Sequence, residues 1–383
     1  MSSQELRPFS VDVPDAVLDD LRDRLARTRW PDQIPGSGWG YGTDLEYLRD
    51  LCETWGTTFD WRAQEKRFNQ WSHFLTDIGG QTVHFIHARS PEPDALPLVI
   101  THGWPGSVAE FLDVIGPLAD PRAHGGDPAD AFHVVAPSIP GYGWSGPTHE
   151  SGWDVRKVSE TWKELMARLG YERYGAQGGD WGSIISSDLG LVDPEHVAGL
   201  HLNMLIAFPP SEGVDELTEQ EQADVDALQA FLQTGTAYQE IHGKNPQTLG
   251  YGLTDSPAGL AGWIVEKFWA WTDNNGSPED AVTRDQLLTN LTVYWVTSTI
   301  NSSVRLYCES QRSGRFGPMG TRVDVPTGAA IFPKEIFRTP RAWAEGTYDL
   351  RRYTRFDRGG HFAALEEPDL LIDDVRAFFR EVR

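Results

Sequence analysis

A nine-residue stretch, GAQGGDWGS at positions 175–183, constrains the fold of this chain more than any other. It follows a predicted strand and precedes a predicted helix. Its Gly178-x-Asp180-x-Gly182 spacing is that of a tight strand-to-helix turn that projects its central residue. The two glycines are required because side chains there would collide with neighbouring backbone. Taken by itself, Asp180 also has a simpler interpretation as a helix N-cap. In either case the turn predicts a strand that runs directly into a helix, with a carboxylate at the helix N-terminus.

The pattern of strands and helices divides the chain into four stretches. Residues 1–90 begin with helical patterns, end with the strand-like QTVHFIHA and carry no catalytic constellation. In residues 91–206, apolar strands such as LPLVITHG alternate with helices, which is typical of a parallel sheet covered on both faces. Residues 207–319 are helical, polar at first and aromatic later, and predict a lid. The strand–helix alternation returns in residues 320–383, so the lid is an insertion between two halves of one α/β core.

The charge and the lack of targeting signals exclude several classes of partner. A net charge of −23 repels phosphate backbones and anionic membranes, so we expect neither a nucleic acid nor a membrane partner. No apolar run approaches the roughly 18 residues of a transmembrane helix, and the N-terminus lacks the features of a signal peptide. Cys52 and Cys308 match no metal or redox spacing, which favours the reducing cytoplasm.

A second motif, HGWPGS at 102–107, stands at the end of the first predicted core strand. A turn here can direct the backbone N–H of Trp104 toward an oxyanion, beside the N–H of Trp181, which follows Asp180 directly. These two groups form the candidate oxyanion hole. His102 is interpreted as a structural residue that braces the turn, with the role of a reactive base as the alternative.

A histidine and a second carboxylate complete the candidate constellation. His361, in DRGGHFAALEEPD, follows the last predicted strand, which is the position expected of a base after the nucleophile and the acid. The carboxylate that orients it is Glu335 in FPKEIF or Asp349 in TYDLRR. Active sites of open α/β sheets lie beyond the carboxyl ends of the strands. This favours Glu335, which directly follows a strand, over Asp349, which precedes one.

An aspartate nucleophile determines the class of reaction. A serine that attacked saturated carbon would form an ether that water cannot cleave, whereas a carboxylate forms an ester that an activated water can hydrolyse. Asp180 therefore predicts substitution at saturated carbon, with a halide or the oxygen of a strained ring as the leaving group. A ring-opened alkoxide needs strong hydrogen-bond donors, for which the lid offers Tyr238, Tyr294 and Tyr307. The residues alone leave both leaving groups open.

Several stretches along the chain carry a family resemblance: TRWPD, GWGYGTDLEYL, FDWR, VHFIHARS, HGWPGS, PSIPGYGWSG, GGDWGS, LTDSPAGLAGWIVEKFWAWTD, VPTGAAIFPKE and RGGHFAALEEPDLL. Through them the chain resembles the microsomal-type epoxide hydrolases over nearly its whole length. The resemblance implies an α/β-hydrolase fold, which is a mostly parallel sheet covered by helices on both faces, with a helical lid and an N-terminal segment that wraps around core and lid. The site residues that it implies are the nucleophile Asp180, the base His361, the acid Glu335, the ring-opening tyrosines Tyr238 and Tyr307, and the oxyanion-hole residues Trp104 and Trp181.

The activity implied by the resemblance is hydrolysis of a hydrophobic epoxide to a vicinal diol, with water as co-substrate and with neither a cofactor nor a metal. The candidate substrate-binding residues are Trp104, Trp181, Phe208 and Trp263. Animal members begin with a membrane anchor, and this sequence starts at the wrapping segment, so a soluble cytoplasmic enzyme is expected. The sequence leaves open a homo-oligomer and a role in detoxification, catabolism or secondary metabolism.

Two other function classes stay in view. A haloalkane dehalogenase would use the same aspartate and histidine chemistry, and halide release would distinguish it. The third class is a non-catalytic binding protein with the same fold. Such proteins usually lose a member of the catalytic constellation, and Asp180, Glu335 and His361 are all present.

Overall fold

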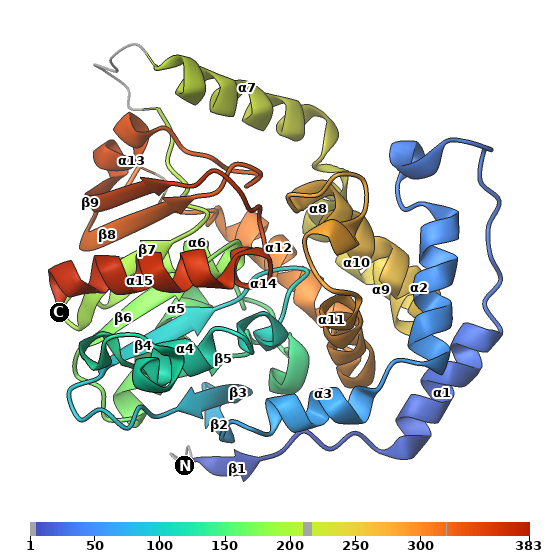
Figure 1. Cartoon of the computed structure of the whole chain (residues 1–383), viewed down its shortest axis with the longest axis horizontal. Helices are drawn as coiled ribbons and strands as arrows, with labels where there is room; N and C mark the ends of the chain where they lie inside the picture. The colour runs from blue at the N-terminus through green and yellow to red at the C-terminus, as the bar shows by residue number, and fades with distance from the viewer. Residues whose placement is uncertain (1–4, 210–216, 319) are drawn as a thin grey trace.

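A nine-stranded sheet runs through the part of the chain that the structure describes, residues 5–209, 217–318 and 320–383 (Figure 1). This structure is a computed structural model. The strand order is β1-β2-β3-β5-β4-β6-β7-β8-β9. The strands are β1 (Arg7–Phe9), β2 (His73–Ile78), β3 (Gln81–Ala88), β4 (Leu96–Thr101), β5 (Phe132–Pro137), β6 (Tyr174–Gly178), β7 (Val197–Leu202), β8 (Val323–Ile331) and β9 (Tyr348–Arg355).

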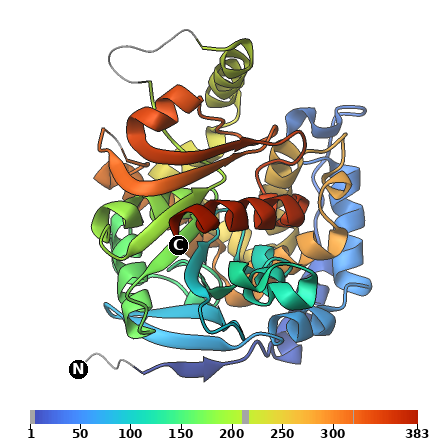
Figure 2. The same cartoon turned by 60° about the vertical axis from the view of Figure 1, so that its left-hand side comes forward.

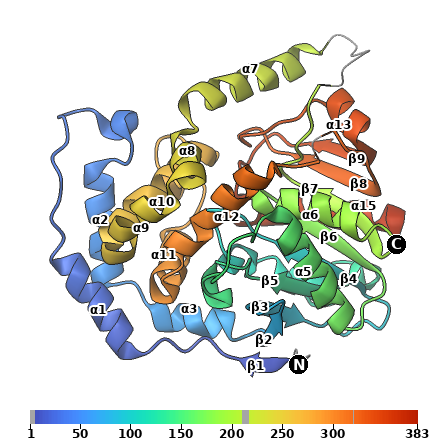
Figure 3. The same ribbon diagram turned by 180° about the vertical axis from the view of Figure 1, so that it is seen from behind.

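Helices cover both faces of the sheet, with α4 and α15 on one face and α5 and α6 on the other (Figures 1 and 3). From β5 to β9 all neighbouring strands are parallel. Every residue of β6 and β7 is buried, as expected of strands with helices on both sides. The predicted sheet, mostly parallel and covered on both faces, is therefore confirmed.

The helices of the core are η2 (Val108–Phe111), α4 (Ile115–Ala119), η3 (Pro121–His124), η4 (Pro128–Asp130), η5 (Gly143–Ser145), α5 (Val155–Arg168), α6 (Trp181–Val192), α13 (Arg341–Thr347), α14 (Ala363–Glu366) and α15 (Pro368–Val382).

The N-terminal stretch contributes to the sheet as well as wrapping around the lid. Its helices α1 and α2 pack against α10, and α3 packs against α11. Its strands β1, β2 and β3 form an antiparallel extension that joins the sheet where β3 pairs with β5. The β2–β3 turn uses Gly79 and Gly80 at φ 58° and 84°, values that favour glycine. The boundary expected at residue 90 therefore divides one continuous sheet. The N-terminal helices are α1 (Asp15–Ala26), η1 (Gly38–Tyr41), α2 (Leu45–Thr57) and α3 (Trp61–Phe68).

The insertion between β7 and β8 is helical wherever it forms regular structure in its described residues, and it lies beyond the carboxyl ends of the central strands (Figure 1). Figure 2 shows α7 at the edge of the molecule, beside β8, β9 and α13. Within the described ranges, no helix has the length and apolar character needed to cross a membrane. The lid helices are α7 (Glu219–Thr234), α8 (Ala237–Lys244), α9 (Pro246–Asp255), α10 (Pro257–Trp271), η6 (Pro278–Asp280), α11 (Arg284–Thr297) and α12 (Ile300–Ser313).

Candidate active site

The turn between β6 and α6 has the close backbone packing that its glycines predict. Asp180 adopts φ 50° and ψ −128°, and such conformations cost about 1–3 kcal/mol in a residue other than glycine. A Cβ at Gly178 would lie 2.2 Å from the carbonyl carbon of Gly182, and a Cβ at Gly182 would lie 1.9 Å from the carbonyl oxygen of Thr101. The bare backbone at both positions therefore allows the crossing that holds Asp180 in this strained conformation.

The carboxylate of Asp180 is held by the HGWPGS turn. The backbone N–H of Trp104 donates to Oδ1 of Asp180 at 2.7 Å. Trp181 opens α6 directly after Asp180, so both candidate oxyanion-hole residues adjoin the carboxylate. Asp180 occupies the N-cap position of α6, but its side chain makes no capping hydrogen bond. The interpretation of Asp180 as a helix cap is therefore wrong.

His102 braces the turn, as its structural interpretation requires. Its Nδ1 lies 3.0 Å from the carbonyl oxygen of Gly103, and its Nε2 accepts the N–H of Ile139 at 3.2 Å. Burial lowers the pKa of His102 to about 4. A neutral ring that donates from Nδ1 satisfies both contacts, so neither nitrogen is left for proton transfer.

Glu335, His361 and Asp180 form a continuous chain of contacts. Nδ1 of His361 lies 2.6 Å from Oε1 of Glu335, and its Nε2 lies 3.4 Å from Oδ2 of Asp180. Glu335 is 0% exposed and His361 4%. The alternative acid, Asp349, lies on β9 and forms an ion pair with Arg351 at 2.8 Å. The structure thus brings Glu335, and not Asp349, to the histidine.

The two carboxylates also determine the protonation of His361. Burial by itself lowers the pKa of this imidazole, but the negative charges of Glu335 and Asp180 outweigh burial and raise the pKa well above its ordinary value. Loss of either negative charge would lower this pKa.

An apolar cavity of about 130 Å³ lies on the lid side of Asp180. The candidate tyrosines Tyr238 and Tyr307 both reach it, from α8 and α12. Their ring centroids lie 5.9 Å apart. The cavity is lined by Asp180, Trp181, Ile184, Met204, Ile206, Phe208, Phe231, Tyr238, Gln239, Tyr307, Phe316, Ile336 and Phe337.

Both tyrosines are held as neutral phenols. Burial, followed by the negative charge of Asp180, raises the pKa of Tyr238. Burial likewise raises the pKa of Tyr307 well above its ordinary value, with Tyr238 and Asp180 adding to the shift. The third tyrosine of the lid, Tyr294, has a structural contact, because its hydroxyl donates to the carbonyl oxygen of Gly106 at 2.7 Å.

The candidate substrate-binding residues separate into two groups. Trp181 and Phe208 line the apolar cavity, and Trp104 stacks on Tyr238 with ring centroids 5.5 Å apart. Trp263 does not line this cavity. Its indole N–H donates to Nε2 of His242 at 3.0 Å, and its ring lines a groove between the lid and the N-terminal segment.

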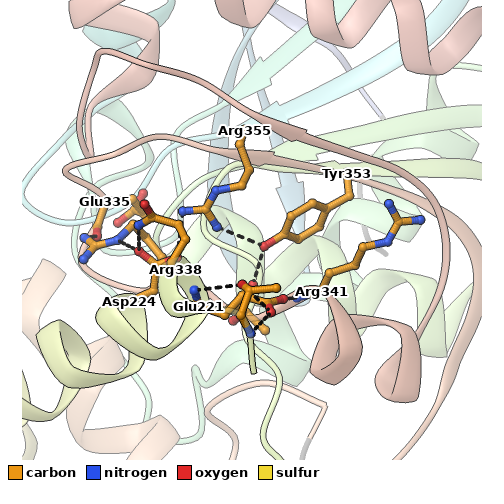
Figure 4. Close-up of polar contacts among 10 residues, drawn as sticks. Glu221, Asp224, Glu335, Arg338, Arg341, Tyr353 and Arg355 are labelled. Atoms are coloured by element: carbon orange, nitrogen blue, oxygen red, sulfur yellow. Dashed lines mark hydrogen bonds and ion pairs between the residues drawn. The ribbon is translucent and has the colours of Figure 1, made fainter. Parts of the chain in front are cut away.

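The loop that carries Glu335 is tied to the lid helix α7 (Figure 4). Arg338 donates to the backbone carbonyl of Glu335 at 2.6 Å and to Asp224 of α7 at 2.8 Å. Arg355 of β9 donates to the other oxygen of Asp224 at 2.7 Å. The backbone N–H of Arg341 also donates to Glu221 of α7 at 3.0 Å. These contacts attach a helix whose buried residue is Asp224 and whose Phe231 lines the apolar cavity.

His73, His84 and His201 make structural contacts. His73 and His84 face each other across the β2–β3 hairpin with ring nitrogens 2.9 Å apart, and His201 on β7 lies 3.0 Å from Asp374. Among the described residues, no group of three or more histidine, cysteine, aspartate or glutamate side chains is arranged to hold a metal ion.

Reasoning from the sequence missed one acidic residue beside Asp180 and His361. Glu110, on the short helix η2, lines a small second cavity together with both of them. The signal available in the sequence was its position only four residues after the last glycine of HGWPGS. That position alone did not show which way the carboxyl group points.

Two family models match overlapping parts of the chain. Residues 6–111 match the family model described as epoxide hydrolase N terminus, and residues 97–241 match the alpha/beta hydrolase fold. A relative from Stigmatella aurantiaca is 45% identical over 379 residues, covering 99% of this chain and 86% of the relative. Epoxide hydrolase 1 of Sus scrofa is 37% identical, covering 98% of this chain and 88% of that protein.

The chain is also similar in structure to solved epoxide hydrolases. The Aspergillus niger epoxide hydrolase superimposes with a TM-score of 0.88 at 32% identity, covering 100% of this chain and 98% of that one. The juvenile hormone epoxide hydrolase of the silkworm Bombyx mori gives a TM-score of 0.91 at 32% identity, with coverage of 100% and 96%. The chain therefore belongs to the microsomal-type epoxide hydrolases, a family of enzymes with the α/β-hydrolase fold.

Proposed function

We propose that this enzyme hydrolyses a hydrophobic epoxide through a covalent ester on Asp180. In the first step, a carboxylate oxygen of Asp180 attacks one ring carbon, and the bond from that carbon to the ring oxygen breaks. The ring oxygen leaves as an alkoxide and takes a proton from Tyr238 or Tyr307, while the other tyrosine donates a hydrogen bond to it. The product of this step is a hydroxyalkyl ester of Asp180.

In the second step, water hydrolyses that ester. His361, oriented by Glu335, removes a proton from the water, whose oxygen bonds to the ester carbonyl carbon. The backbone N–H groups of Trp104 and Trp181 stabilise the oxyanion of the tetrahedral intermediate. Collapse of the intermediate breaks the bond between the ester carbonyl carbon and the diol oxygen, which takes the proton of the new carboxyl group, so that the diol and the Asp180 carboxylate are formed. The proton that His361 took from water then passes to the tyrosinate, which restores both residues.

The charge balance of the site favours this order of events. Formation of the ester removes the negative charge of Asp180, which had raised the pKa of His361 and of both tyrosines. Their pKa values therefore fall once the ester forms. The tyrosines become better proton donors as the alkoxide appears, and the lower pKa of His361 favours the neutral imidazole, which acts as the base in the second step.

The apolar cavity supports a hydrophobic substrate. Its walls are mainly aliphatic and aromatic, and its few polar lining residues include Asp180, Gln239 and the two tyrosines. The observation that carries the proposal is this placement of Asp180, with the tyrosines in the cavity on one side and His361 3.4 Å away.

Removal of the imidazole tests the proposal, because it should stop the second step and spare the first. His361→Ala mixed with styrene oxide should gain the mass of one intact epoxide, on the peptide that carries Asp180, and release little diol. In the unmutated enzyme, a single turnover in ¹⁸O-water should give mostly unlabelled diol and leave the label on Asp180. Diol labelled in the first turnover, with no adduct on His361→Ala, would refute the covalent route.

A further inference from the structure

The second cavity beside Asp180 has the size and lining of a site for one water molecule. Its volume is about 20 Å³, and a single water needs roughly 10–15 Å³ of such volume. Asp180, His361 and Glu110 line it together with the side chains of Gln177 and Asn203, whereas Tyr238 and Tyr307 belong to the apolar cavity. Asp180 is thus shared between an apolar space for the substrate and a smaller polar space next to the base.

The position of Glu110 in this cavity depends on a glycine of the HGWPGS motif. A Cβ at Gly106 would lie 1.3 Å from Oε1 and 2.6 Å from Cδ of Glu110. The carboxyl group therefore packs directly on the bare backbone of Gly106. Any side chain at position 106 would expel it from the cavity.

The carboxyl group of Glu110 is suited to bind a neutral water molecule. Burial is the largest of several influences that together raise the pKa of Glu110 to about 8. The charge of His361 lowers it and that of Asp180 raises it. At neutral pH the group is mostly a protonated acid, which can both donate and accept a hydrogen bond.

We propose that Glu110 positions the water that hydrolyses the Asp180 ester, holding it in this cavity beside His361. The proposal rests on the covalent mechanism given above and assigns the site of its second step. His361 takes the proton from the water, and the water oxygen bonds to the ester carbonyl carbon. Glu110 keeps its own proton and directs a lone pair of the water toward that carbon.

A purely structural role for Glu110 makes a different prediction. Ser107 and Glu110 have the S-x-x-E spacing of a capping box, and a hydrogen bond with the Ser107 backbone lowers the pKa of Glu110. Loss of a cap would lower the thermal stability of the protein and affect both chemical steps alike. Loss of a water-positioning group would slow ester hydrolysis alone.

The test measures the two steps separately in Glu110→Leu and Glu110→Gln. Single-turnover reactions with styrene oxide are quenched over time, and intact-protein mass follows formation and decay of the ester. In Glu110→Leu, alkylation should keep its rate while ester decay slows about 10²-fold, so the ester accumulates during turnover. Glu110→Gln should recover most of the lost rate, because its amide also donates and accepts. Thermal unfolding of both variants measures the contribution of the cap.

Each outcome bears on the proposal. Ester decay at the unmutated rate in Glu110→Leu would overturn it, as would equal slowing of both steps. A Glu110→Gln variant as slow as Glu110→Leu would also overturn it, since a charged carboxylate would then be required. If Glu110→Leu does not fold, Glu110→Gln is compared with the unmutated enzyme at both steps. Ester decay that is much slower in Glu110→Gln than in the unmutated enzyme would then overturn the proposal. The His361→Ala arm reports separately on the covalent route: if it forms no adduct, the proposed function fails, whatever the Glu110 variants do.

Discussion

Replacing Glu335 with glutamine would remove a negative charge 2.6 Å from His361 and keep the shape of the side chain. Oε1 of Glu335 contacts Nδ1 of His361 and accepts the N–H of Ile336 at 2.7 Å. An amide oxygen can accept both hydrogen bonds. In Glu335→Gln the imidazole should therefore keep its orientation and lose only its charged partner.

This change should slow ester hydrolysis, because His361 becomes positively charged when it takes a proton from water and Glu335 stabilises that charge. A hydrogen bond to a charged group is worth about 1.5–3 kcal/mol, and about 1.4 kcal/mol corresponds to a tenfold change in rate. Ester hydrolysis should thus slow by roughly 10- to 150-fold. Because Glu335 is 0% exposed and His361 4%, solvent screens the pair weakly, and we expect the upper part of this range. Alkylation of Asp180 needs no base and should be nearly unchanged.

The pH dependence of the same variant has a definite sign. Hydrolysis requires neutral His361, so kcat falls as pH is lowered through the pKa of this imidazole in the ester intermediate. Glu335 is one of the charges that raise this pKa. Its loss should lower this pKa. The fall of kcat on the acid side of the pH profile, the acid limb, should therefore move to lower pH, even though the maximal kcat is smaller.

Rapid-quench kinetics with intact-protein mass would separate alkylation from hydrolysis, and steady-state kcat across acid and neutral pH would locate the limb. Asp349→Asn is the matched control, because Asp349 pairs with Arg351 on β9 away from His361. It should leave both steps and the acid limb unchanged. Normal hydrolysis and an unmoved limb in Glu335→Gln, together with slow hydrolysis in Asp349→Asn, would show that the acid was misassigned.

Three further predictions concern ring opening, the turn and the lid. Tyr238→Phe and Tyr307→Phe should each slow ester formation by roughly 10²–10³, measured in a single turnover; two single variants with full rates would mean that other groups stabilise the alkoxide. Gly182→Ala should prevent folding or strongly lower the unfolding temperature, since its Cβ would lie 1.9 Å from a backbone carbonyl oxygen of β4; a stable, active variant would contradict the turn geometry. Asp224→Asn should speed hydrogen exchange of the α7 amides, because it weakens both ion pairs of the buried Asp224 carboxylate, whereas Asp226→Asn on the exposed face of α7 should not. Equal exchange in the two variants would argue against the attachment of α7 through Asp224.

Much of the fold follows from local rules. The alternation of strands and helices was predicted for residues 91–206 and 320–383, and the lid was predicted from the break in that alternation. The pairing of β1, β2 and β3 with the central sheet was not predicted, because no pattern within residues 1–90 shows that β3 lies beside β5. Strand pairing over such distances is determined by the packing of the whole domain.

Some features of the candidate active site likewise follow from local sequence, and others depend on tertiary packing. The glycines around Asp180 and the order of Asp180, Glu335 and His361 along the chain could be read directly, because sterics and strand ends are local properties. The preference for Glu335 over Asp349 follows from the strand ends, whereas the contact of Glu335 with His361 depends on how the loop after β8 packs against the loop after β9.

The sequence by itself determined which chemistry is available: an aspartate on a glycine-flanked turn, a late histidine and tyrosines in a helical insertion. Only the tertiary structure decided which side chains share a space. Trp263 donates a hydrogen bond to His242, and Glu110 packs against the backbone of Gly106. The two tyrosines line one cavity and His361 lines another. The reason is physical. Backbone sterics act over a few residues, whereas convergence in a cavity depends on how distant segments pack.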